Sequence, residues 1–128
     1  MSREDPYLSV QTFALGDIER ETLDNQDFRR VAHRTPDMEL TYYSINKADA
    51  HIPEEIHPST TQFIRVEAGR GYALLDDMRK ELRPDTYLIV FPGTRHEIVM
   101  EGSAPLKLYS IYAPPVHPVG LVQQRRLE

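Results

Sequence analysis

Residues 86–100 read Thr86-Tyr87-Leu88-Ile89-Val90-Phe91-Pro92-Gly93-Thr94-Arg95-His96-Glu97-Ile98-Val99-Met100, two apolar segments on either side of a Pro-Gly turn. β-branched and aromatic residues favour strands, whereas Pro and Gly end them. The same alternation of apolar segment and turn recurs about every ten residues, at 38–45, 62–67, 72–75 and 106–112. Short strands at this spacing predict an antiparallel sandwich or barrel.

One helix is expected ahead of these strands, from Asp17 to about Asn25. Asp17 is a good N-cap residue, and acidic side chains follow it in the first turns. The chain therefore divides into an N-terminal segment at residues 1–27, a barrel at residues 28–118 and a C-terminal tail at residues 119–128. Both ends are expected to be weakly ordered.

The composition limits the classes of protein to consider. The 128 residues suit one domain, and 15 basic against 20 acidic side chains give a formal charge of −5, which disfavours nucleic-acid binding. The chain has no cysteine, which excludes thiolate chemistry and fits a reducing compartment, so we expect a cytoplasmic protein. It contains no apolar run of the roughly 18 residues that span a membrane, and its start does not resemble a signal peptide. We therefore expect neither a nucleic acid nor a membrane as partner.

Side chains that can bind a metal gather in residues 51–62. Without cysteine, a transition-metal site has to use imidazole, carboxylate or amide groups. In an extended segment, side chains two residues apart share a face. Glu55 and His57 therefore point the same way, whereas Glu54 points to the opposite face.

Two further polar residues can join this face. The turn at residues 58–60 breaks the strand, so Gln62 can return to the face of Glu55 and His57, with Ile64 and Val66 behind it. His96 begins the strand at residues 96–100, at the mouth of an otherwise apolar face, where a metal can be held.

The spacing of these residues resembles the two sequence motifs of the cupin superfamily. Glu55-x-His57-x4-Gln62-x6-Gly69 is similar to the first motif, and Pro92-Gly93-Thr94-x-His96 is similar to the second. The resemblance covers about residues 28–118. It implies an all-β double-stranded β-helix, or jelly-roll, barrel with a short N-terminal helical or extended segment. It also implies one divalent metal and a homodimer. Residues 54–58 and 62–65 resemble a subgroup of small cupins described as sugar-phosphate isomerase-like.

The sequence departs from the family's motifs in three places. Asp85-Thr86 replaces the Gly-Asp that usually opens the second motif, where Phe91 also occupies the usual Pro. The other two departures bear on the chemistry of the site. Glu55 stands where the family has a His, and Gln62 stands where it has a Glu. The implied metal ligands are Glu55, His57, Gln62 and His96, for Fe, Mn, Ni or Zn. Two imidazoles and one carboxylate resemble the facial triad of non-haem iron sites. Three alternatives remain open: a solvated Glu55, a core Gln62 hydrogen-bonded to His57, and His51 as a replacement ligand.

This ligand set favours a metal-dependent enzyme, such as an isomerase or a dioxygenase, acting on a small polar molecule of sugar or carbonyl type. No catalytic residue is assigned. The alternatives are a non-catalytic small-molecule-binding barrel with a weak or empty metal site, and a purely structural barrel. The sequence has no Gly-x-Ser-x-Gly or Gly-x-Gly-x-x-Gly motif, which disfavours serine hydrolases and dinucleotide-binding proteins.

The remaining histidines and tyrosines are expected to play lesser roles. His33 and His117 lie beside turn residues, and both are expected to be exposed. Packing is expected of the tyrosines Tyr42, Tyr43, Tyr87 and Tyr112. Tyr109 or Arg65 can supply a polar contact to a ligand.

Overall fold

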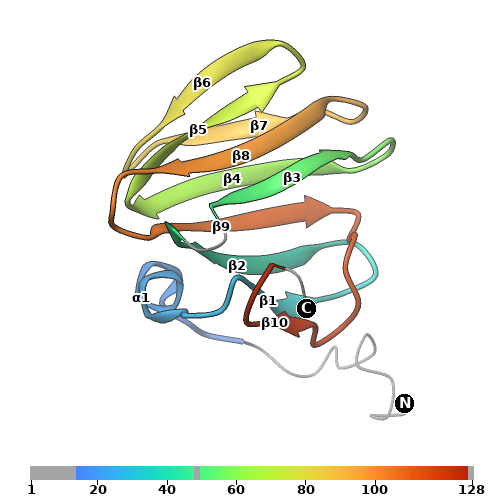
Figure 1. The fold of residues 1–128 in the computed structure, drawn as a ribbon. Helices are drawn as coiled ribbons and strands as arrows, with labels where there is room; N and C mark the ends of the chain where they lie inside the picture. Colours follow the sequence, from blue (N-terminus) through green and yellow to red (C-terminus); the bar gives the residue numbers. More distant parts are fainter. Residues whose placement is uncertain (1–13, 48–49, 127–128) are drawn as a thin grey trace, which may run out of the picture.

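The computed structural model describes residues 14–47 and 50–126. In this part of the chain one short helix precedes a series of strands (Figure 1). The elements are α1 (Ile18–Asp24), β1 (Arg29–Arg34), β2 (Glu39–Ile45), β3 (His51–Ile56), β4 (Thr61–Ala68), β5 (Arg70–Leu75), β6 (Met78–Leu82), β7 (Tyr87–Val90), β8 (Arg95–Glu101), β9 (Leu106–Ala113) and β10 (Val122–Gln123). Residues 1–13 of the expected N-terminal segment and the last two residues of the expected tail lie outside the described residues. None of the helical structure described is long and apolar enough to cross a membrane.

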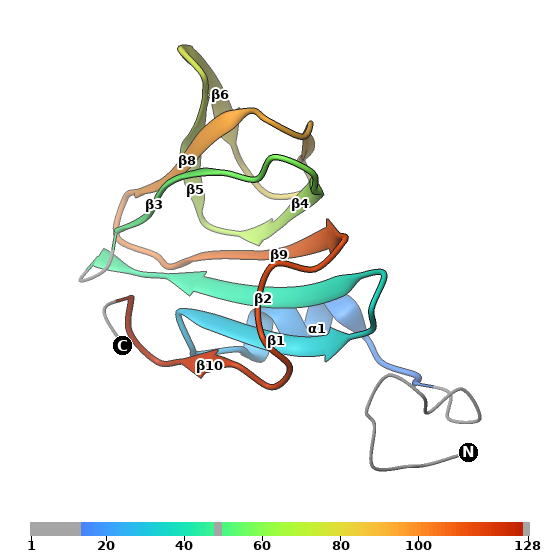
Figure 2. The same cartoon turned by 90° about the vertical axis from the view of Figure 1, so that its right-hand side faces the viewer.

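The strands form two antiparallel sheets that face each other (Figures 1 and 2). The larger sheet has the order β10-β1-β2-β9-β4-β7, and the smaller one has the order β3-β8-β5-β6. Strands that are distant in sequence pair with each other, such as β2 with β9 and β3 with β8. This arrangement confirms the predicted all-β jelly-roll barrel.

Apolar side chains from both sheets fill the space between them. Ile64 and Val66 of β4 are fully buried, as is Leu108 of β9, and Ile98 of β8 meets them from the smaller sheet. The alternation along β4 agrees with the sequence pattern, because Gln62, Ile64 and Val66 all point inward. The inward face of β4 is therefore apolar at Ile64 and Val66 and polar at Gln62, near the start of the strand.

The predicted helix is confirmed at α1. The Asp17 carboxylate accepts a hydrogen bond from the backbone N–H of Arg20 at 3.2 Å, which caps the first turn. The helix contacts β9, β4 and β2 of the larger sheet. The buried ammonium of Lys107 on β9 donates to the backbone carbonyl of Asn25, which ties the end of the helix to the sheet.

Four strands lie outside the apolar segments of the sequence: β1, β3, β6 and β10. Most of their side chains are exposed or half-buried, so few apolar residues are needed in them. β10 lies in the range expected to be a tail, and it pairs with β1 through Arg29 opposite Gln123. The larger sheet is therefore extended by a strand that hydropathy alone does not mark.

Candidate functional site

The four predicted metal ligands lie close together, on the end of β3, just after β3, at the start of β4 and at the start of β8. Glu55 and His96 are direct cross-strand partners on β3 and β8. The rings of His57 and His96 have centroids 5.1 Å apart. Gln62 is linked to them by Tyr112. The Gln62 amide contacts the Tyr112 hydroxyl, and the rings of Tyr112 and His57 have centroids 5.8 Å apart.

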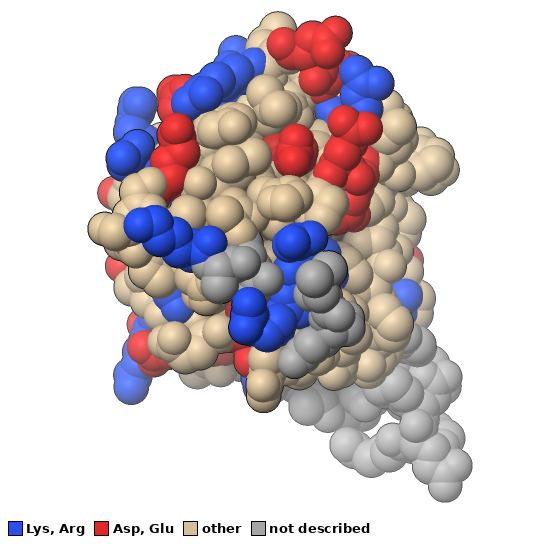
Figure 3. Space-filling view, viewed as in Figure 1, with Lys and Arg blue, Asp and Glu red and all other residues tan. Residues whose placement is uncertain are grey.

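A bulge in β3 sets the direction of Glu55. The pairing with β8 shifts register between Ile52 and Glu55, so that Pro53 and Glu54 together oppose one residue of β8. Ile52 and Glu55 then both face the interior. Glu54 is exposed and its carboxylate lies 3.6 Å from the guanidinium of Arg95, which agrees with the predicted opposite directions of the two glutamates. The face of the molecule seen in Figure 3 carries interspersed acidic and basic side chains.

Glu55 lies beside two side chains that can carry a positive charge, His57 and Arg29. Its carboxylate lies 3.2 Å from Nε2 of His57 and 3.8 Å from the guanidinium of Arg29. Burial opposes ionisation of Glu55, but the hydrogen bond from His57 and the charges of His57, Arg29 and His96 outweigh it. The pKa of Glu55 is therefore below its ordinary value, and the carboxylate is an anion at neutral pH.

His96 is buried and has a defined tautomer. Its Nδ1 lies 2.9 Å from the carbonyl oxygen of Thr94, and a carbonyl can only accept, so Nδ1 carries the proton. Burial, only partly offset by this bond, lowers the pKa of His96. The ring is thus neutral, and its Nε2 offers a lone pair to a metal or a ligand.

Gln62 is 3% exposed, and its amide is held at one end only. Nε2 donates to the hydroxyls of Ser110 at 3.1 Å and Tyr112 at 3.2 Å. Oε1 is buried and has no hydrogen-bond partner in the described chain. The alternative in which Gln62 bonds to His57 is therefore wrong, because the amide is bound to β9 instead.

Sequence reasoning missed a hydrogen-bonded tyrosine pair in the same place. The hydroxyls of Tyr43 and Tyr112 are 2.6 Å apart, and Nε of Arg29 donates to Tyr43 at 3.2 Å. Burial raises the pKa of both tyrosines, so both are neutral donors at physiological pH. They are buried as predicted, but their hydroxyls also form part of the site. We call the following set the polar cluster: Arg29, Tyr43, Glu55, His57, Gln62, His96, Ser110 and Tyr112.

The other predictions for histidine and tyrosine have mixed outcomes. His33 is exposed as expected, but His117 is not, because its Nδ1 lies 2.7 Å from the fully buried carboxylate of Glu39. Tyr87 is 64% exposed and packs by stacking on Phe63, so its packing contact lies outside the barrel core. The exposure of His117 and Tyr87 depends on how the strands pair, so it could not be predicted from their neighbours along the chain.

His51, Tyr109 and Arg65 lie outside the polar cluster. His51 begins β3 opposite Val99, ahead of the bulge that turns Glu55 inward. Arg65 is on the outward face of β4, where its guanidinium forms 2.9 Å ion pairs with Glu67 and Asp85. Tyr109 is the cross-strand partner of Arg65 on the same face.

The donor atoms of the polar cluster suit a divalent transition ion. Ligands bound at 2.0–2.2 Å and at right angles on one ion are about 3 Å apart, and the Glu55 oxygen and His57 Nε2 are separated by 3.2 Å. His96 adds a neutral imidazole with a free Nε2. Within residues 14–47 and 50–126, however, no group of three or more His, Asp or Glu side chains is placed so that it could hold a metal ion. The types of donor atom therefore fit a metal, whereas the positions of the three side chains do not surround one point.

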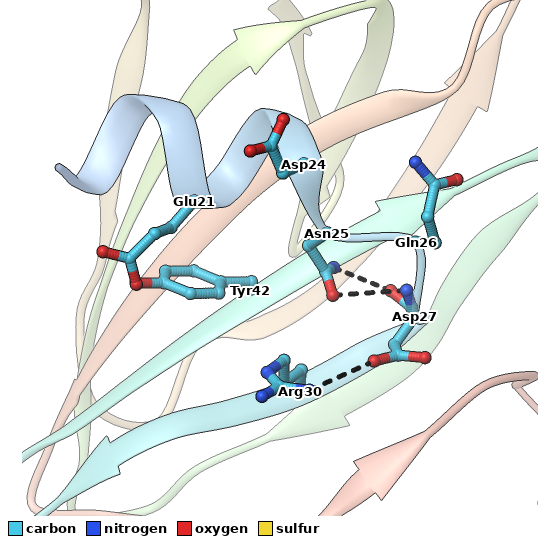
Figure 4. Close-up of a pocket in the computed structure, with 7 residues that line it drawn as sticks. All are labelled: Glu21, Asp24, Asn25, Gln26, Asp27, Arg30 and Tyr42. Atoms are coloured by element: carbon cyan, nitrogen blue, oxygen red, sulfur yellow. Dashed lines mark hydrogen bonds and ion pairs between the residues drawn. The ribbon is translucent and has the colours of Figure 1, made fainter. Parts of the chain in front are cut away.

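A separate acidic hollow of about 330 Å³ lies between the end of α1 and the start of β1 (Figure 4). Its polar groups are largely satisfied by one another. The Asn25 side chain bonds both backbone polar groups of Asp27, the Asp27 carboxylate lies 3.7 Å from Arg30, and Tyr42 donates to Glu21 at 3.0 Å. These contacts hold the helix against the sheet and are not connected to the polar cluster.

Comparison with known proteins agrees with this architecture. The sequence model of the cupin domain family matches residues 41–112. YrkC of Bacillus subtilis is 36% identical over 87% of this chain, and the chain spans only 62% of that protein. Protein L612 of Acanthamoeba polyphaga mimivirus is also 36% identical, over 85% of this chain and 70% of its own length.

A solved structure matches almost the whole fold. BH2720 from Bacillus halodurans is 37% identical, with a TM-score of 0.86 over 92% of this chain and 93% of that protein. The matched family region contains His57, Gln62 and His96, and the barrel is the one that the two motifs imply. This chain belongs to the cupin family.

Proposed function

We propose that the barrel binds one divalent transition metal through Glu55, His57 and His96, next to a bound small polar molecule. The observation that carries the proposal is the contact of the Glu55 carboxylate with His57 Nε2 at 3.2 Å, with a second imidazole beside them. Two imidazoles and one carboxylate leave positions open on an ion for a substrate. Fe, Mn, Ni and Zn all suit this donor set.

A bound ion would supply a Lewis acid that polarises a carbonyl or hydroxyl oxygen of the substrate. The protein side chains have separate tasks. Glu55 provides the negative charge that offsets the ion, and the neutral Tyr43 and Tyr112 hydroxyls line the same space as hydrogen-bonding groups. Arg29 contributes a positive charge at the edge of the cluster. This arrangement favours a small substrate of sugar or carbonyl type, with isomerase or dioxygenase chemistry.

A second function, metal-free binding of a small molecule without turnover, has its own support. Arg29 already lies 3.8 Å from Glu55, so a protein cation partly balances this carboxylate. The incomplete grouping of the three metal donors points the same way. In this function the cluster recognises its ligand by hydrogen bonds alone.

The two functions are separated by measuring metal content and zinc affinity on protein without a histidine tag. For the metal function we expect near-stoichiometric binding that falls at least a hundredfold in His57→Ala. The matched control is His33→Ala, because His33 is an exposed histidine outside the cluster. If no ion binds to the unaltered protein, the metal function is wrong and metal-free binding takes its place.

We also infer a homodimer, formed through the outward face of β7 and its neighbours. Tyr87 and Phe91 are 64% and 68% exposed there, and Arg65 offsets part of the charge of Glu67 and Asp85. Two copies of a chain with formal charge −5 repel each other less across exposed apolar side chains than across acidic ones. Light scattering is expected to give twice the chain mass, and Phe91→Ser to reduce it. Ile56→Ser, which changes an exposed apolar residue elsewhere, is the control.

We likewise propose a cytoplasmic location, which is supported by the absence of cysteine from the sequence.

A further inference from the structure

We infer that Gln62 is a hydrogen-bond donor to an oxygen of the bound ligand, rather than a fourth metal donor. The inference rests on the proposed function in one respect, that the ligand binds at the polar cluster. Gln62 is almost completely buried, and its Oε1 has no partner among the described residues. A buried polar atom of this kind is costly unless a group from outside the chain satisfies it or the amide turns.

The hydrogen bonds around Gln62 start from Arg29, whose guanidinium can only donate. Arg29 Nε lies 3.2 Å from the Tyr43 hydroxyl, which therefore accepts. Either hydroxyl can donate in the 2.6 Å contact between Tyr43 and Tyr112, so only one of the two tyrosine protons has its acceptor there. Tyr112 has one proton of its own, and the amide of Gln62, at 3.2 Å, is the group next to it.

The amide has two orientations, related by a half turn of its terminal bond. In the present one Nε2 donates to the hydroxyls of Tyr112 and Ser110, so the amide offers neither hydroxyl proton an acceptor. Among the described residues, one proton of the tyrosine pair and Gln62 Oε1 are then both left without a partner. After the half turn, Oε1 accepts from both Tyr112 and Ser110, and the series from Arg29 to Gln62 has an acceptor for each hydroxyl proton. The free end of the amide is then its NH2 group.

This orientation determines what Gln62 can bind. An amide NH2 donates and offers no lone pair to a cation, so Gln62 cannot bind the metal through it. It needs an acceptor, and the inward face of β4 directs it toward the space between the sheets. The acceptor class is a carbonyl or carboxylate oxygen of a small molecule. The hydroxyls of Tyr43 and Tyr112 act as positioning groups that fix the amide in this orientation.

The test measures zinc and pyruvate binding separately. Zinc affinity is measured by calorimetry for the unaltered protein, Gln62→Leu and Tyr112→Phe. Pyruvate, which carries a keto and a carboxylate oxygen, is then titrated into the zinc-loaded, ¹⁵N-labelled proteins. The Gln62 NH2 resonances are identified by their absence from Gln62→Leu. The control is Gln26→Leu, which removes an exposed glutamine.

We expect zinc affinity to change by less than about threefold in both cluster variants. We expect pyruvate to shift the Gln62 NH2 resonances, and its affinity to fall at least about tenfold in Gln62→Leu and about fivefold in Tyr112→Phe. Gln26→Leu is expected to match the unaltered protein. Circular dichroism verifies the fold, and Gln62→Met replaces Gln62→Leu if the latter unfolds.

Three results would overturn the inference. They are a tenfold loss of zinc affinity in Gln62→Leu, an unchanged pyruvate affinity in that variant, and no binding of pyruvate to the unaltered protein. Failure of the unaltered protein to bind zinc contradicts the metal proposal alone. The pyruvate titration is then run without metal, and its dependence on Gln62 decides the inference.

Discussion

Two carboxylate–imidazole pairs in this barrel have the same chemistry and different surroundings. The site pair is Glu55 with His57, at 3.2 Å, and the sheet pair is Glu39 with His117, at 2.7 Å. Glu39 is completely buried and also accepts from the Thr41 hydroxyl and from the backbone N–H groups of Val116 and His117. The side chain of Glu55 is 28% exposed, and among the described residues its one other ion-pair contact is Arg29 at 3.8 Å.

The difference lies in how many acceptor positions are filled. The carboxylate of Glu39 is surrounded by donors from β2 and from the segment after β9, so it holds that segment across the end of the sheet. The carboxylate of Glu55 has fewer bonded donors among the described residues, which leaves room for the proposed metal or ligand. The pKa is lowered for both glutamates, in each case because hydrogen bonds and histidine charge outweigh burial. The pKa direction therefore does not distinguish a structural pair from a functional one, whereas the count of bonded donors does.

The largest effect is expected from breaking the sheet pair. Glu39→Ala leaves the donors of Thr41, Val116 and His117 without their acceptor, and breaking such a buried pair costs about 3–5 kcal/mol of unfolding free energy. Urea denaturation measures this cost. Glu54→Ala, which removes an exposed glutamate, is the control and is expected to stay within about 0.5 kcal/mol. A loss under about 1 kcal/mol for Glu39→Ala would remove the distinction between the two pairs.

The site pair is expected to give the opposite result. Glu55→Gln should change the unfolding free energy by less than about 1 kcal/mol, because the carboxylate is part exposed. Zinc affinity in the same variant is expected to fall at least a hundredfold, about 2.7 kcal/mol. Parallel denaturation and calorimetry on one preparation check both values. Unchanged zinc affinity would mean that Glu55 is not a metal donor.

Acidification is expected to act on the sheet pair through Glu39. Burial opposes ionisation of Glu39, but its hydrogen bonds with His117 and Thr41 and the charge of His117 lower its pKa below the unfolded value. Its contribution to stability is therefore present above the ordinary carboxyl pKa and is lost as pH falls through the folded pKa. Denaturation between pH 7 and pH 3 should show a steeper decline for the unaltered protein than for Glu39→Gln. Parallel curves for the two proteins would contradict this assignment.

The smallest effect is expected at Arg29, and its sign is informative. Arg29→Gln removes a cation 3.8 Å from the Glu55 carboxylate, so zinc should bind about threefold to fivefold more tightly, as expected for a weak ion pair of under about 1 kcal/mol. The control is Arg30→Gln, which changes the exposed arginine next to Arg29 in the sequence. A weaker affinity in Arg29→Gln would show that Arg29 supports the metal site instead of competing with it.

Local sequence patterns predicted most of the barrel and part of the site. Alternation along β4 placed Gln62, Ile64 and Val66 on one inward face, and the two-residue spacing placed Glu55 beside His57. Both depend only on neighbours along the chain. Tyr43 and Tyr112 could not be assigned in this way, because their hydroxyls meet through the pairing of β2 with β9. His117 was misjudged for the same reason, since its partner Glu39 is far away in sequence.

The bulge in β3 also determines how the site responds to insertions and deletions. It arises because Pro53 and Glu54 together oppose a single residue of β8. Removing either of the adjacent glutamates would give a regular strand in which Ile52, the remaining glutamate and His57 occupy alternate positions on the inward face. A chain one residue shorter would therefore present the same inward sequence of groups. A deletion of one residue at this point would therefore keep a carboxylate on the inward face of the strand.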